Sequence, residues 1–60
     1  MPSPVRYGIV RKMLEARGYF FDRSSGSHHV FVKPGAGSFS IPVQGGKVKP
    51  VYVRQIEKLP

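Results

Sequence analysis

Two glycine-containing turns divide the middle of this chain into three short segments of strand type, and this arrangement restricts the fold more than any other feature of the sequence. Residues 19–23 are rich in aromatic side chains, and the turn chemistry of residues 24–27 closes this first segment. Residues 28–33 form the second segment, which ends at the turn Pro34–Gly37, and residues 38–43 form the third. Two consecutive hairpins predict a three-stranded antiparallel meander.

Helical patterns flank the predicted meander on both sides. Ser3 followed by Pro4 is a typical start signal of a helix, and apolar residues recur at helical spacing from there until Gly18. We therefore expect a first helix over residues 4–17. Its apolar side is formed by Val5, Ile9, Val10, Met13 and Leu14. A second, short helix is expected from Pro50 to the end of the chain, with an apolar stripe of Val53, Ile56 and Leu59.

The order helix, strand, strand, strand, helix predicts an α+β fold. Because each helix must bury its apolar stripe and connections between elements are short, both helices are expected on one face of the antiparallel sheet. The other face is then left open to solvent. This plan is also that of the double-stranded-RNA-binding domain, although a shared plan says nothing about activity. No linker or repeat interrupts the 60 residues, so residues 1–60 are expected to form a single domain.

Basic residues dominate the charge of the chain. Ten Lys and Arg residues stand against three Asp and Glu residues, and the resulting net charge of +7 attracts polyanions. Nucleic acid is therefore the leading partner. The chain has no cysteine, no apolar run long enough to span a membrane and no signal-peptide pattern, which predicts a cytoplasmic protein without membrane contact.

One motif stands out at the start of the expected central strand, the run Gly26–Phe31. Further elements accompany it, in chain order Lys12–Glu15 before Gly18 and Tyr19, then Ile41–Val43 and Gly45–Lys47. Set in this order over nearly the whole chain, they resemble the HicA toxin family. Two departures are Gln44, near which many family members carry another histidine, and the end at Pro60, beyond which relatives often continue.

The resemblance implies the toxin of a type II toxin–antitoxin system. Such a toxin is an endoribonuclease that cleaves messenger RNA without a metal or other cofactor, and a HicB-type antitoxin protein holds it inactive. The single catalytic histidine of the family falls on His28. The chemistry of this residue type agrees, because an imidazole with its ordinary pKa of about 6.5 exchanges protons near neutral pH. RNA supplies its own nucleophile, the 2′-hydroxyl group.

The two neighbouring histidines are expected to differ in exposure. Successive strand residues point to opposite faces of a sheet, so a buried Phe31 would place His29 on the helix-covered face and His28 on the open face. The two imidazoles then cannot share one metal ion, and no metal site is predicted. Without the family pattern, a hydrogen-bonded strand histidine with no chemistry would be the preferred interpretation of His28.

Phosphate contacts are expected from residues that would border the open face, namely Arg23, Ser27, Lys33, Lys47, Lys49 and Arg54. An ordinary solvated rim explains the cations among them almost equally well. Tyr7, Phe39 and Tyr52 are candidates for stacking on unpaired bases, although packing in the core or at an edge is favoured for each.

Two other functions are compatible with the sequence. A non-catalytic RNA-binding module of the same fold would need the charge and the open sheet but no titrating histidine. A protein-binding adaptor would need an exposed apolar patch, for which the sequence offers few residues beyond the core. Cleavage of RNA separates the first alternative from the endoribonuclease.

Overall fold

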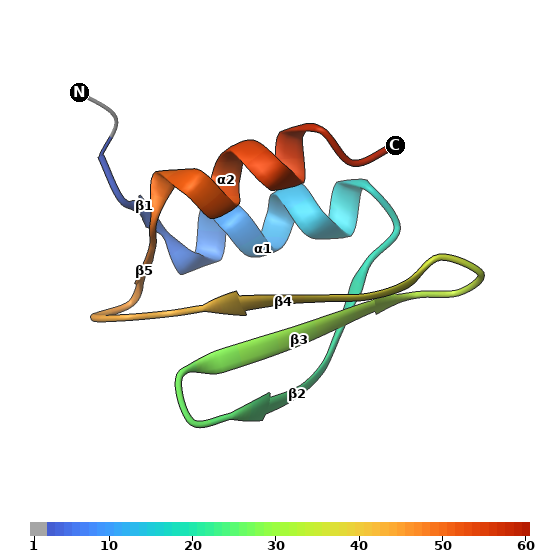
Figure 1. Ribbon diagram of the computed structural model, residues 1–60, viewed down its shortest axis with the longest axis horizontal. Coiled ribbons are helices and arrows are strands. Elements are labelled where there is room, and N and C mark those ends of the chain that lie inside the picture. Colours follow the sequence, from blue (N-terminus) through green and yellow to red (C-terminus); the bar gives the residue numbers. More distant parts are fainter. Residues whose placement is uncertain (1–2) are drawn as a thin grey trace.

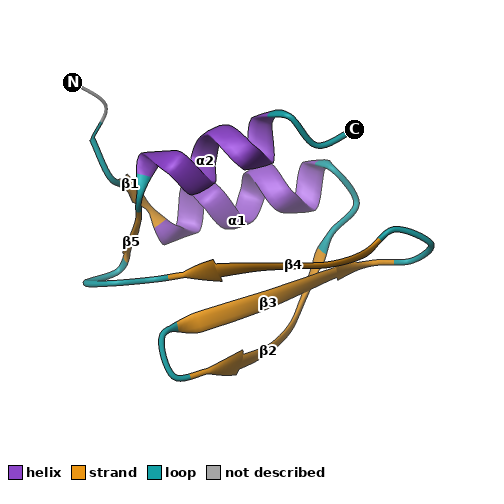
Figure 2. Cartoon of the chain, in the orientation of Figure 1, coloured by secondary structure: helices purple, strands orange, loops and turns teal. Residues whose placement is uncertain are grey.

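The computed structural model describes residues 3–60, and its elements follow the expected order with one addition near each helix start. In chain order they are β1 (Val5–Arg6), α1 (Tyr7–Ala16), β2 (Phe20–Ser25), β3 (His28–Lys33), β4 (Gly37–Pro42), β5 (Lys47–Val48) and α2 (Pro50–Glu57). Figure 2 shows the helices and strands along the chain. The elements α1, β2, β3, β4 and α2 confirm the predicted α-β-β-β-α plan of an α+β fold.

The three longer strands form one antiparallel sheet in the order β2-β3-β4, as predicted. Ser25 lies opposite His28, so Gly26 and Ser27 make a two-residue turn. Gly26 has a φ of 58°, which a glycine adopts without the steric cost that a side chain would impose, and tight hairpin turns need such an angle. A register shift between Phe21 and Arg23 marks a β-bulge in β2.

The predicted start of the first helix at Ser3 and Pro4 is wrong. Val5–Arg6 forms β1 instead and pairs antiparallel with β5, where Val5 lies opposite Val48. The helix begins at Tyr7, and the residue before it makes no side-chain cap hydrogen bond. A Ser-Pro start signal acts only within one turn, whereas this ladder joins two distant parts of the chain and accompanies the complete burial of Val48.

Both helices lie side by side on one side of the sheet (Figure 1). They contribute to a single buried cluster that consists of Val10, Leu14, Tyr19, Phe31, Ile41, Val48 and Ile56. The apolar stripe predicted for the first helix is confirmed for Val10 and Leu14 but not for Ile9, which is 54% exposed. In the described part of the chain, no helix is long and apolar enough to cross a membrane.

Candidate active site

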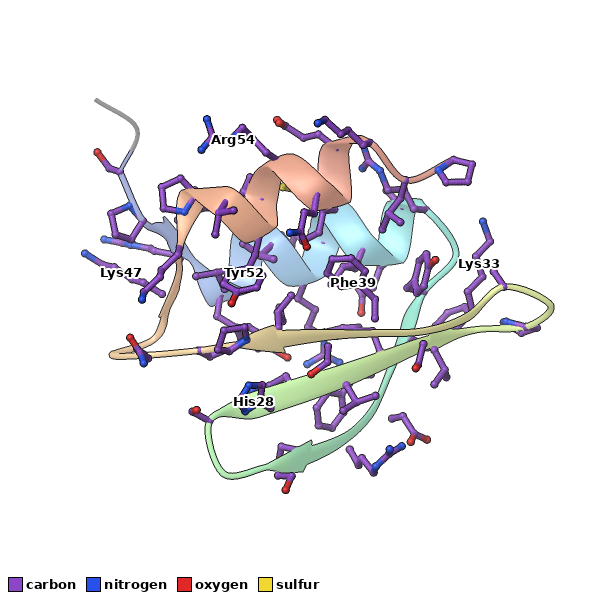
Figure 3. All side chains as sticks on the ribbon, viewed as in Figure 1. His28, Lys33, Phe39, Lys47, Tyr52 and Arg54 are labelled. Carbon is purple, nitrogen blue, oxygen red and sulfur yellow. The ribbon has the colours of Figure 1, made fainter. Side chains whose placement is uncertain are left out.

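His28 is the first residue of β3 and lies on the face of the sheet that the helices leave open. Phe31 is fully buried, so the alternation of side chains along β3 places His29 on the helix-covered face and His28 on the opposite face. His28 is exposed, between Ser25 of β2 and Pro42 of β4. The predicted exposure of this histidine is thus confirmed. Figure 3 shows His28 at one end of β3 and Lys33 at the other end.

His29 is half-buried and packs against aromatic side chains. Its ring centroid lies 4.8 Å from that of Tyr7 in α1 and 5.8 Å from that of Phe21 in β2. Its Nδ1–H donates to the carbonyl of Ser27 at 3.4 Å. The surroundings of His29 are therefore those of a packing residue, and its ring faces away from the surface that carries His28.

The backbone directly before His28 is tied to the end of the neighbouring strand. The N–H of Val43 donates to the Ser27 carbonyl at 2.7 Å, a short and well-formed hydrogen bond. The same carbonyl accepts the weaker bond from His29. The exposed imidazole of His28 thus follows a carbonyl that is hydrogen-bonded to the end of the neighbouring strand, and such support helps to place a side chain accurately.

The open face consists of three rows of residues that lie opposite one another on the three strands, since cross-strand partners share a face. In order along β3, the rows are Ser25, His28 and Pro42; then Arg23, Val30 and Ser40; then Phe20, Val32 and Ser38. Among the predicted phosphate-binding cations, only Arg23 belongs to these rows. Its Nη1 lies 2.6 Å from a carboxylate oxygen of Asp22, and the two side chains are 67% and 43% exposed.

Two of the predicted cations lie elsewhere. Lys33 is two residues from the buried Phe31 and therefore points to the helix-covered side, where its Nζ lies 5.7 Å from the ring centroid of Tyr19. The expectation that Lys33 borders the open face is wrong. Strand alternation, applied to Lys33, would have predicted its place on the helix-covered side. Arg54 projects from α2, on the helix layer of the molecule (Figure 3).

Lys47 and Lys49 form a basic patch together with a residue that the sequence did not single out. They flank the buried Val48 and so point away from the core. Lys47 lies directly opposite Arg6 in the ladder between β1 and β5. We call Arg6, Lys47 and Lys49 the basic patch. Arg6 was missed because β1 was not expected and its pairing is not visible in the local sequence.

The loop that leads to the basic patch begins beside the histidine. Gln44 and Lys47 exchange two backbone hydrogen bonds of 2.9 and 3.0 Å, and the carbonyl of Gly46 accepts the N–H of Tyr7 at 2.9 Å. Gln44 thus takes part in this loop through its backbone. Lys47 lies toward the same end of the molecule as His28 (Figure 3).

The three aromatic residues considered for base stacking are partly buried and pack against the core cluster, as favoured from the sequence. They are Tyr7, Phe39 and Tyr52. The large aromatic side chain that the open face does expose is Phe20, which is 58% exposed. Its place on this face follows from its pairing with Val32 and from the register shift between Phe21 and Arg23, neither of which the sequence shows.

These features define a class, a small basic α+β domain that presents an exposed imidazole on an open sheet surface. The chain belongs to a known family, since the family model described as HicA toxin of bacterial toxin-antitoxin matches residues 9–59. The protein is therefore a toxin of a toxin–antitoxin system, and toxins of this family are in general ribonucleases that pair with an antitoxin. Neither the curated proteins nor the solved structures contain a match to the chain.

Proposed function

We propose that this chain is a metal-independent endoribonuclease of the cytoplasm that cleaves messenger RNA with His28 as its catalytic residue. No cofactor takes part, and a HicB-type antitoxin neutralises the toxin. The observation that carries the proposal is the exposed imidazole of His28 on the open face, in a chain that belongs to the HicA family. Residue type, exposure and a fixed backbone together suit proton transfer to or from a bound polymer.

The proposed reaction is an internal transesterification. The imidazole of His28 accepts the proton of a ribose 2′-hydroxyl, and that oxygen attacks the adjacent phosphorus. The bond between phosphorus and the 5′-oxygen of the next nucleotide breaks, and this oxygen leaves with a proton from water. The products are a 2′,3′-cyclic phosphate and a 5′-hydroxyl end, so no atom from a protein nucleophile or a metal-bound water is needed.

Arg23 is the cation that we assign to the reacting phosphate. It lies opposite Val30, two residues from His28, which corresponds to about 7 Å along the strand. A guanidinium group reaches over such a distance and binds phosphate oxygens through paired N–H donors. Its contact with Asp22 is exposed and therefore weak, so a phosphate can compete for it.

The other proposed contacts lie further from the histidine. Ser27 is adjacent to His28 in the turn, and Lys47 and Lys49 of the basic patch lie beyond the loop that follows β4. Lys33 and Arg54 remain proposed contacts for more distant phosphates, because neither lies on the open face. Their contribution is non-specific attraction of the RNA backbone, which salt weakens.

The test compares the unmodified protein with His28→Ala on single-stranded RNA in excess chelator. We expect cleavage by the unmodified protein, cyclic phosphate ends, and loss of cleavage in the variant. A substrate with 2′-deoxyribose at the cleaved position should resist both proteins. His29→Phe is the matched control, since it removes the neighbouring imidazole but keeps a ring against Tyr7 and Phe21.

Equal cleavage by both proteins would show that His28 is not the catalyst. RNA binding without any cleavage would instead identify a non-catalytic RNA-binding module, the alternative that the charge and the open face also allow. Cleavage that stops only when chelator is added would contradict the metal-independent reaction.

A further inference from the structure

The open face exposes a large aromatic side chain that lies outside the buried core cluster. Phe20 is 58% exposed and lies opposite Val32, in the third row of the open face. We propose that Phe20 is a stacking platform for an unpaired base, so that the substrate of this toxin is bound as single-stranded RNA across the open face. This inference rests on the proposed function and names its substrate class.

The surroundings of Phe20 are those of a binding surface. Its neighbours in the chain lie elsewhere: Tyr19 is buried, and Phe21, which is 40% exposed, lies opposite the buried Phe31 on the helix-covered side. On the open face, Val30 and Val32 are only half-buried, so they form an apolar floor beside the phenyl ring. Contiguous apolar surface of this kind, bordered by polar residues, marks an interaction site.

Charge decides which partner fits this surface. The chain carries a net charge of +7, and Arg23 stands in the row between Phe20 and His28. A second copy of the chain would bring the same positive charge, which repels. A nucleic-acid strand instead offers flat apolar rings and negative phosphates in alternation, which matches an aromatic ring followed by a guanidinium group.

The spacing of the three side chains suits an RNA strand laid along β3. Arg23 lies about 7 Å and Phe20 about 13 Å along the strand from the row of His28, as the rise per residue requires. A ribose at His28, a phosphate at Arg23 and a base on Phe20 are therefore in a line. Bases within a duplex are already stacked on one another, so the platform selects unpaired RNA.

The experiment measures binding of short labelled RNA to protein that carries His28→Ala, so that cleavage does not interfere. Phe20→Ala, Phe20→Leu and Phe20→Trp are added singly to this background. We expect Phe20→Ala and Phe20→Leu to weaken the binding of single-stranded RNA by roughly 5- to 150-fold, the range for loss of one stacked base. Phe20→Trp should retain binding, because it keeps a π-face that a leucine lacks.

Two controls separate stacking from loss of structure. Ile9→Ala removes an equally exposed apolar side chain, 54% exposed, from α1 and should leave RNA binding unchanged. Thermal denaturation of each variant should show that Phe20→Leu and Phe20→Ala remain folded. The affinity for the matched RNA duplex should not change among the Phe20 variants, because no base of a duplex reaches the platform.

The proposal is overturned if Phe20→Leu binds single-stranded RNA as tightly as its parent, or if all Phe20 variants lose duplex and single strand equally. The Phe20 variants are also co-expressed with the antitoxin. If they bind RNA unchanged but no longer bind the antitoxin, Phe20 is a protein contact and the proposal fails. These outcomes are independent of catalysis. Failure of the proposed function appears as absent or His28-independent cleavage, whereas failure of this inference appears in the binding data alone.

Discussion

The two faces of the central strand β3 differ in burial, and its two histidines illustrate the difference. His29 shares a face with the fully buried Phe31 and packs between Tyr7 and Phe21. His28, its neighbour in sequence, lies exposed on the open face. The alternation of the strand thus places identical side chains, one residue apart, in a packed and in an exposed environment.

This comparison indicates that the helix-covered face serves mainly stability, whereas the open face is free to serve RNA binding and cleavage. On the covered face a substitution changes packing, so its effect appears in the free energy of unfolding. On the open face a side chain has few protein contacts to lose, so its effect should appear in RNA binding or cleavage. Four predictions test this separation, from the largest expected effect to the smallest.

The largest expected effect is that of His28→Ala on cleavage. Loss of a general acid or base usually lowers a rate by about 10²- to 10⁴-fold. The melting temperature should hardly change, because His28 is exposed and makes no side-chain hydrogen bond among the described residues. Cleavage rates under single-turnover conditions and thermal denaturation check both parts. A large loss of stability in His28→Ala would contradict the view that side chains of the open face contribute little to stability.

Phe31→Ala should have the opposite profile. Removal of a fully buried phenyl ring costs about 3–5 kcal/mol, which is comparable to the whole stability of about 3–9 kcal/mol expected of a domain this small. We expect largely unfolded protein by circular dichroism. Val32→Ala, on the open face of the same strand, should cost about 1 kcal/mol or less. Similar losses in both variants would contradict the assignment of the faces.

His29→Ala should lower stability without a direct effect on catalysis. Two aromatic contacts and one weak hydrogen bond are lost, for which about 1–2 kcal/mol is expected. For a chain of this size, each kcal/mol lowers the melting temperature by about 4–8 °C. Chemical denaturation and cleavage at low temperature check this. A cleavage defect as severe as that of His28→Ala, in protein shown to be folded, would contradict the prediction.

The smallest expected effect on stability is that of Lys47→Glu in the basic patch, where stability and RNA binding should change in opposite directions. The unmodified ladder places Lys47 opposite Arg6, and replacing this like-charge pair by an opposite-charge pair should stabilise the fold by about 0.2–1 kcal/mol. The same change should weaken RNA binding and reduce its dependence on salt. Lys58→Glu, which alters the charge equally but lies after α2 and outside this ladder, should bring no gain in stability.

Most of the fold followed from local chemistry. Glycine at the tight turn and alternation along a strand act over a few residues, so both hairpins and the opposite orientation of His28 and His29 were correctly predicted. The same alternation also assigns Lys33 to the covered side, whereas the expectation for this residue rested on its charge alone. Local signals failed at Ser3 and Pro4, where β1 pairs with a distant strand.

The sequence by itself thus determined the order of elements, the meander and the face on which His28 lies, because turn and strand preferences depend on neighbouring residues. Only the tertiary structure decided that Arg6 meets Lys47 and that Phe20 is the aromatic ring exposed on the open face. The physical reason is that these properties depend on which distant strands pair and how far the helices extend over the sheet, and no local pattern specifies either.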